Sequence, residues 1–204
     1  MYISTFELFK IGIGPSSSHT VGPMIAAKHF SKKISSYENL TKITIDLYGS
    51  LALTGKGHGT DKAISLGLMG FAPETLSANI IDSKIKEINN SGFISVSNSR
   101  SIKFDFSKNI IYNKVFDKYK YSNTMVFKAF DKSDKLYENI FYSIGGGFII
   151  DENNQNSDTN LSNKVPFNFK SGNELLKLCN NNDLNIYDIV RKNEESYNSN
   201  ININ

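Results

Sequence analysis

Apolar side chains recur at steps of three and four residues over 21–34, as at Val21, Met24 and Phe30. This spacing places them along one face of a helix, so it predicts an amphipathic helix over that range. The serine run Ser16–Ser18 stands just before it, and short hydroxyl side chains are preferred where helices begin. We therefore expect the serine run to cap the helix.

A strand is predicted over Thr41–Tyr48, where Ile43, Ile45 and Leu47 alternate with polar residues. Successive side chains of a strand point to opposite faces, so the alternation indicates one buried face and one exposed face. Gly49-Ser50 follows directly and is expected to end the strand.

A hairpin is predicted over residues 123–143. Met125, Phe127 and Ala129 alternate along the first strand, Asp131–Asp134 forms the turn, and Leu136–Tyr142 returns as the second strand. The triplet Gly145–Gly147 is expected to end this hairpin, and residues 148–150 continue as a short apolar segment.

The rest of the chain carries weaker patterns. Residues 75–105 predict no definite element, and residues 152–164 are typical of a polar, Asn-rich loop. Ser171–Asn180 carries three leucines and predicts a short helix, whereas the pattern beyond Lys192 dissolves into polar residues typical of disorder. The sum predicts an α+β fold: a mostly antiparallel sheet with helices packed on it.

Composition and charge narrow the functional classes. The chain has 204 residues, enough for one domain with a tail, and a net charge of +3 without a clustered basic face, which argues against nucleic-acid binding. Its apolar runs are shorter than a membrane span needs, so we expect a cytoplasmic protein. Cys179 is the single cysteine and is interpreted as structural, because one thiol forms no intramolecular disulfide.

The first segment with chemical potential is Gly14–Thr20, which contains Ser16, Ser17, Ser18 and His19. The N–H groups at a helix start are unpaired and carry partial positive charge, so such a site favours an anion. Hydroxyl groups add short donors, and a small carboxylate fits this set as well as a phosphate does. The alternative is an ordinary serine cap with spare hydroxyls.

The second segment, Thr54–Asp61, is expected to be a glycine-rich loop in which Gly55, Gly57 and Gly59 alternate with Lys56 and His58. Lys56 offers charge for a carboxylate, and His58 titrates near neutrality and suits proton transfer. The spacing matches neither a phosphate-binding loop nor a dinucleotide fingerprint. The alternative is a flexible, positively charged turn.

A short helix is expected after this loop. Thr60 would cap it, Asp61 would lie against its positive end, and apolar residues continue to Leu68. The third glycine segment, Gly145–Gly147, is either a tight turn or another ligand-facing loop. His29 falls within the amphipathic helix and is interpreted as an exposed or packing histidine.

Three stretches of the chain resemble one enzyme family, in register and in order. They are FKIGIGPSSSHTVGPM at 9–24, DLYGSLALTGKGHGTD at 46–61 and YSIGGGF at 142–148. The chain resembles the N-terminal β-domain part of single-chain, iron–sulfur-dependent L-serine dehydratases (L-serine ammonia-lyases). The likeness implies a fold similar to the allosteric substrate-binding domain of some phosphoglycerate dehydrogenases.

The resemblance also implies a division of labour. A [4Fe–4S] cluster would be held by a separate α domain, and this chain would help it convert L-serine to pyruvate and ammonia. The implied catalytic residues are His58 and His19. The implied substrate-binding residues are Ser16, Ser17, Ser18, Thr20, Lys56, Thr60, Asp61, Ser143, Gly145 and Gly146, and no metal ligand is expected in this chain.

The resemblance sets the expected domain organisation as well. Residues 1–150 would form the β domain, and 151–204 a linker, a short helix and a disordered Asn-rich tail leading toward an α domain that is missing here. The expected partners are L-serine, the α domain or α chain and a second copy of this chain, with neither nucleic acid nor membrane. Alone, the chain would be inactive. The alternatives are a non-catalytic serine-sensing domain and a truncated remnant.

Overall fold

The computed structural model describes residues 4–97, 100–115, 118–153 and 165–197. The chain divides into two compact units. The larger spans Lys10–Ser157, and the smaller combines Met1–Phe9 with Asp158–Asn204. Each unit is described by itself.

The larger unit alternates helices and strands along the chain. In order, its elements are η1 (Ser17–Val21), α2 (Gly22–Ile34), β1 (Lys42–Gly49), α3 (Ser50–His58), α4 (Thr60–Leu68), η2 (Pro73–Thr75), α5 (Ala78–Ser91), β2 (Phe93–Val96), β3 (Arg100–Lys103), α6 (Phe106–Asn109), β4 (Ile110–Tyr112), β5 (Asn123–Asp131), β6 (Asp134–Gly145) and β7 (Phe148–Asp151).

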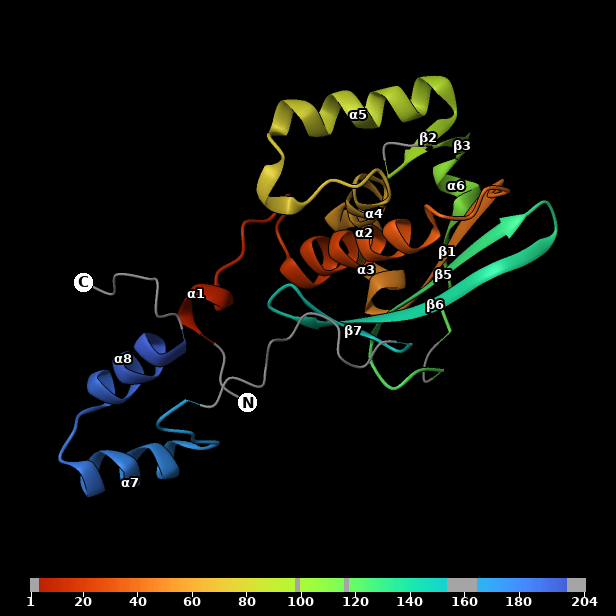
Figure 1. Cartoon of the computed structure of the whole chain (residues 1–204). Helices are drawn as coiled ribbons and strands as arrows, with labels where there is room; N and C mark the ends of the chain where they lie inside the picture. The colour runs from red at the N-terminus through yellow and green to blue at the C-terminus, as the bar shows by residue number, and fades with distance from the viewer. Residues whose placement is uncertain (1–3, 98–99, 116–117, 154–164, 198–204) are drawn as a thin grey trace. The chain divides into compact units, whose positions relative to one another are not determined.

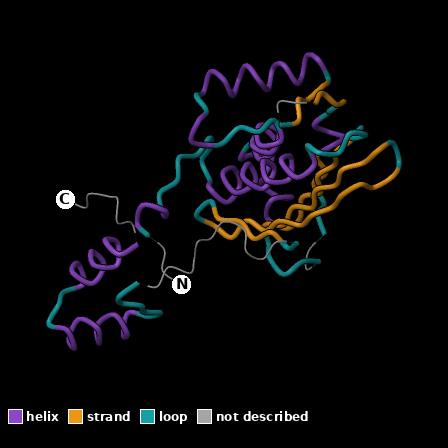
Figure 2. The backbone as a smooth tube through the Cα atoms, in the orientation of Figure 1, coloured by secondary structure: helices purple, strands orange, loops and turns teal. Residues whose placement is uncertain are grey.

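A five-stranded sheet of order β4-β1-β5-β6-β7 organises this unit. Only the β1–β4 pair is parallel among its ladders, and β2 and β3 form a separate antiparallel pair. The expected α+β class with a mostly antiparallel sheet is therefore confirmed. The predicted hairpin is β5–β6, and its long strands curve beneath the helices (Figure 2).

The core lies between the sheet and the helices on one of its faces (Figure 1). Phe30 of α2 packs against Phe127 of β5 with ring centroids 5.1 Å apart, and Phe127 meets Phe141 of β6 at 5.6 Å. The predicted helix over 21–34 and the predicted strand over 41–48 both supply this core, and burying each such side chain stabilises the fold by about 1.5–3 kcal/mol.

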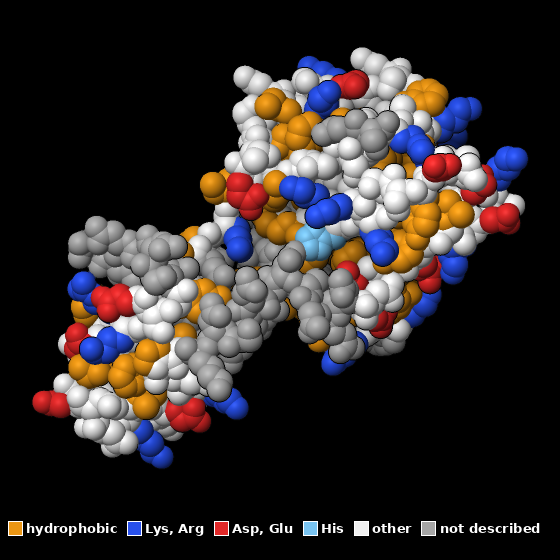
Figure 3. Space-filling model, viewed as in Figure 1, with side chains coloured by type: hydrophobic (Ala, Val, Ile, Leu, Met, Phe, Trp, Pro, Cys, Tyr) orange, Lys and Arg blue, Asp and Glu red, His pale blue; other side chains and the backbone are white. Residues whose placement is uncertain are grey.

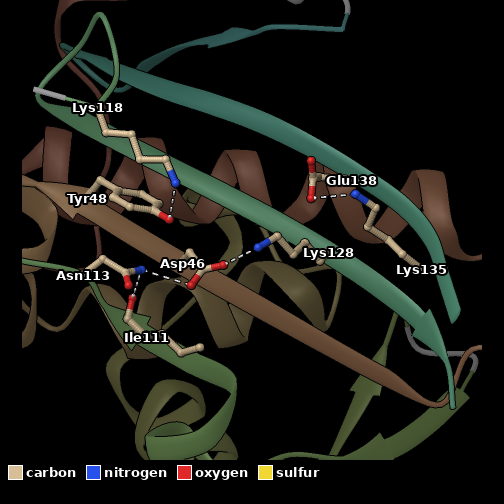
Figure 4. A network of polar contacts seen from close by, with 8 residues as sticks. All are labelled: Asp46, Tyr48, Ile111, Asn113, Lys118, Lys128, Lys135 and Glu138. Carbon is tan, nitrogen blue, oxygen red and sulfur yellow. Dashed lines mark hydrogen bonds and ion pairs between the residues drawn. The ribbon is translucent and has the colours of Figure 1, made fainter. Parts of the chain in front are cut away.

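The prediction that β1 has one exposed face is wrong, because both faces of this strand are buried. On the second face Asp46 pairs with Lys128 at 2.8 Å and accepts a hydrogen bond from Asn113 at 3.0 Å (Figure 4). Lys118 Nζ lies 3.4 Å from the Tyr48 hydroxyl. Polar side chains that are paired in this way can be buried at little net cost, so alternation alone did not reveal the second buried face.

The prediction of a glycine-rich loop at 54–61 is also wrong. The chain stays helical through His58 in α3, turns at Gly59 with φ +76° and begins α4 at Thr60. Each glycine inside a helix costs about 1 kcal/mol. Leu51 and Gly55 of α3 are buried, and this tertiary packing outweighs the weak local preference.

Residues 75–105 contain α5, which the sequence analysis left unassigned. Its Ile81, Ile85 and Ile88 recur at helical steps, and Ile88 is buried. The many polar residues between them hid a regular pattern. The predicted loop at 152–164 falls almost wholly outside the described residues.

The smaller unit contains α1 (Thr5–Leu8), α7 (Gly172–Asn182) and α8 (Ile186–Tyr197). The predicted helix near 171–180 is confirmed as α7, with Ser171 as its cap and Cys179 buried. The predicted disorder beyond Lys192 is wrong up to Tyr197. Ser4 donates to the Glu194 carboxylate at 2.6 Å, a partner far away in the sequence, and this buried pair anchors α8.

Among the residues that the structure describes, no helix has the length and apolar character needed to cross a bilayer.

The first prediction follows from the close contact between α2 and α4. A Cβ at Gly67 of α4 would lie 2.2 Å from the Met24 carbonyl oxygen of α2, so Gly67→Ala must push the helices apart. We expect a loss of about 1–3 kcal/mol of unfolding free energy, measured by urea denaturation.

Gly57→Ala is the matched control, because a Cβ there meets nothing within 4 Å inside α3. It should leave stability unchanged or raise it by up to about 1 kcal/mol. Equal losses in the two variants would contradict close packing at Gly67.

Candidate functional site

The segment Ser16–Val21 begins the site. Ser16 precedes the π-helical turn η1, which leads directly into α2, so the first residue of α2 follows a residue that is already helical. The serine run therefore does not cap α2 with its side chains, a correction to the sequence analysis. Instead Thr20 Oγ1 donates to the Ser16 carbonyl at 2.6 Å, and two serine hydroxyls turn toward His19.

His19 is 8% exposed and surrounded by hydroxyl groups. Its Nδ1 lies 2.9 Å from Ser18 Oγ and 3.4 Å from Ser16 Oγ. Its Nε2 lies 3.0 Å from Thr54 Oγ1 and 3.2 Å from Ser50 Oγ. Burial, reinforced by the neighbouring His58, holds the pKa of His19 below its ordinary value, so the ring favours its neutral form.

His58 lies beside His19, with ring centroids 4.7 Å apart. It ends α3, is partly exposed and has its Nδ1 2.8 Å from the Thr54 carbonyl oxygen. A carbonyl only accepts hydrogen bonds, so Nδ1 of His58 carries a proton and Nε2 presents a lone pair. The structure thus brings the segments Gly14–Thr20 and Thr54–Asp61 together in space.

A buried hydrogen bond joins the segment Gly14–Thr20, the first motif, to the segment Thr54–Asp61, the second motif. Thr60 Oγ1, from the fully buried first residue of α4, donates to the His19 carbonyl at 2.6 Å. A Cβ at Gly55 would lie 3.0 Å from that hydroxyl oxygen, so Gly55 leaves room for the bond. Thr60 thus binds the first motif rather than capping α4, where Gly59 is the N-cap.

The third segment lies against the same turn. Gly145, Gly146 and Gly147 all have positive φ, so they form a tight turn, and a Cβ at Gly147 would meet the Val21 side chain at 2.8 Å. Ser143, just before this turn, is 2% exposed, and its hydroxyl has no hydrogen-bond partner in the described structure.

Other predicted residues occupy the margin of the site. Ser17 is partly buried in η1, Lys56 is exposed on α3, and Asp61 accepts a hydrogen bond from the Lys62 N–H in the first turn of α4. In the described part of the chain, the hydrogen bonds to the two imidazoles come from Ser16, Ser18, Ser50 and Thr54.

Three residues at this site were missed by the sequence analysis. Ser50 and Thr54 lie one helical turn apart on α3, which becomes visible only once this segment is known to be helical. Asn123 of β5 donates from Nδ2 to the Ser143 carbonyl at 3.3 Å, while its Oδ1 is buried without a partner. No local pattern marks Asn123 as different from other strand residues.

Basic and apolar side chains surround histidine atoms that reach one face of the molecule (Figure 3). Within the described residues, no three His, Cys, Asp or Glu side chains gather to form a metal site. The arrangement consists of a buried imidazole that favours its neutral form, a second, partly exposed imidazole, and hydroxyl groups around the first.

Comparison with known proteins agrees with the motifs. Residues 4–154 match the family described as serine dehydratase beta chain. The chain is 39% identical over 201 residues to an L-serine dehydratase of Haemophilus influenzae, covering 96% of this chain and 44% of that protein. It is 42% identical over 196 residues to L-serine dehydratase TdcG of Escherichia coli. That match covers 94% of this chain and 43% of the TdcG protein. The chain thus spans less than half the length of these relatives.

The second prediction follows from the unpaired hydroxyl of Ser143. A buried polar group without a partner costs about 1–3 kcal/mol, so Ser143→Ala should leave the unfolding free energy unchanged or raise it. Thr124→Val is the matched strand control, because its buried hydroxyl donates to the Tyr121 carbonyl at 2.6 Å.

Thr124→Val should lose about 1 kcal/mol in the same urea titration. A loss of similar size in Ser143→Ala would mean that the Ser143 hydroxyl is already satisfied.

Proposed function

Because the chain belongs to the serine dehydratase β chain family, we propose that it is the substrate-handling half of an L-serine dehydratase. The reaction converts L-serine to pyruvate and ammonia. A proton leaves Cα and hydroxide leaves Cβ, and the resulting aminoacrylate tautomerises and is hydrolysed. The other half of the enzyme, an α domain or α chain, completes the site, and we expect the assembly to work in the cytoplasm as a homodimer.

The observation that carries this proposal is the pairing of His19 with His58. Their ring centroids are 4.7 Å apart, yet His19 is enclosed by hydroxyl groups while His58 is partly exposed. A general base must present a lone pair to the substrate, and the bond from Nδ1 of His58 to the Thr54 carbonyl leaves Nε2 for that role. We assign His58 as the base that accepts the Cα proton, and His19 as the ring that holds the surrounding hydroxyl groups in place.

The carboxylate of L-serine needs donors and positive charge. Ser17 and Lys56 are proposed to supply them, since the hydroxyls of Ser16 and Ser18 are directed to His19. Ser143 and the turn Gly145–Gly147 would form a wall of the pocket.

The resemblance implies a [4Fe–4S] cluster, and the residues of this chain do not fit one. Cysteine thiolates from several positions hold such clusters, whereas Cys179 is the single cysteine of this sequence and is buried in α7. We therefore assign the cluster to the α half, and the roles proposed for His19 and His58 do not involve it.

The proposal predicts the effect of removing each histidine. Co-production with a cluster-bearing α half under anaerobic conditions should give serine-dependent pyruvate. His58→Ala should lower kcat at least about 100-fold, because general-base catalysis contributes about 10²–10⁴-fold. Pyruvate formation is measured in a coupled assay.

His29→Ala in α2 is the matched control and should stay within about twofold of the unmodified chain. Equal losses in the two variants would contradict the assignment of His58. Serine binding without any pyruvate would favour a sensing domain instead.

A further inference from the structure

Thr54 contacts both imidazoles through two different atoms. Its Oγ1 lies 3.0 Å from Nε2 of His19, and its carbonyl oxygen lies 2.8 Å from Nδ1 of His58. The same Oγ1 is 3.0 Å from the Ser50 carbonyl oxygen, one turn earlier in α3. No other described residue hydrogen-bonds to both rings.

Counting protons assigns each of these bonds. A hydroxyl has one hydrogen, and the Ser50 carbonyl can only accept, so the Thr54 hydroxyl donates to Ser50. Toward His19 the Thr54 oxygen therefore accepts at 3.0 Å, which requires a hydrogen on Nε2 of His19. The Ser50 hydroxyl, 3.2 Å from the same nitrogen, is the more distant of its two partners and can also accept from it. The Ser18 hydroxyl then donates to the bare Nδ1 of His19 at 2.9 Å.

His58 has the opposite arrangement. The Thr54 carbonyl only accepts, so the hydrogen of His58 is on Nδ1 and the lone pair is on Nε2. The two neighbouring rings thus carry their hydrogens on different nitrogens. An imidazole in water exchanges between its two tautomers, so the protein must hold each ring in one of them.

We propose that Thr54 is a positioning residue that sets the tautomers of both rings, Nε2–H in His19 and Nδ1–H in His58. One imidazole nitrogen, Nε2 of His58, is then left to accept a proton. The link to catalysis rests on the proposed function, whereas the tautomers themselves do not.

The surroundings of His19 are consistent with this role. His58 is the ionisable neighbour that lowers the pKa of His19, and the hydrogen-bond partners of the His19 ring are uncharged serine and threonine hydroxyls. Burial and His58 hold the pKa of His19 low, so His19 stays neutral near pH 7.

The sequence is well suited to a direct test, because it contains three histidines, and His29 serves as an internal reference. Long-range ¹H–¹⁵N correlation spectra of the whole chain, labelled in the imidazoles, report which nitrogen carries the hydrogen in each ring. We expect Nε2–H for His19 and Nδ1–H for His58 at pH 7.5.

Thr54→Val separates the two contacts, since it deletes the hydroxyl and keeps the carbonyl. Thr54 is exposed, so the variant should fold. We expect the Nε2 and Nδ1 signals of His19 to shift and its Nε2 hydrogen to exchange faster with water, while His58 keeps Nδ1–H. Thr54→Ser should restore the His19 signals.

Two results would overturn the proposal: a His58 that carries its hydrogen on Nε2, or His19 signals that Thr54→Val leaves in place. Both results come from spectra of this chain by itself, with no α half present. A failure to form pyruvate would therefore count against the proposed function and leave the tautomer assignment standing.

Discussion

The site depends on one buried hydrogen bond, from Thr60 Oγ1 to the His19 carbonyl oxygen at 2.6 Å. Thr60 is fully buried where α4 begins, and His19 belongs to the turn that leads into α2. An unmade bond at this depth would leave two polar groups unpaired, at a cost of about 1–3 kcal/mol each. The bond therefore holds the start of α2 against the junction of α3 and α4, and the two imidazoles come together as a result.

This constraint explains why the site combines helix ends with small residues. Gly55 leaves room for the Thr60 hydroxyl, and Gly67 lets α4 approach α2 farther along. The π-helical turn η1 turns His19 inward, where four hydroxyl oxygens surround it. The result is an enclosed ring that favours its neutral form, beside a second ring that is partly exposed.

Much of this could be predicted from the sequence, and the failures have identifiable causes. The β5–β6 hairpin and α2 were predictable because their apolar spacing is local and regular. Gly55 and Gly57 hid α3, since only its packing against the core outweighs their cost. Glu194 holds α8 through Ser4, a partner that no local window contains.

The same reasoning applies to the site. The motif resemblance predicted His19 and His58, and the structure brings their rings together. Thr54 was hidden because its role follows from the helical spacing of α3, which the glycines obscured. Asn123 was hidden because its significance lies in an unpaired oxygen, a property of the packed structure rather than of the sequence.

The central claim, that the two motifs form one site, can be tested by a single nuclear Overhauser measurement on the chain. With ring centroids 4.7 Å apart, His19 and His58 should show a cross-peak between their imidazole ring protons. Its absence from spectra in which both rings are assigned would contradict the account.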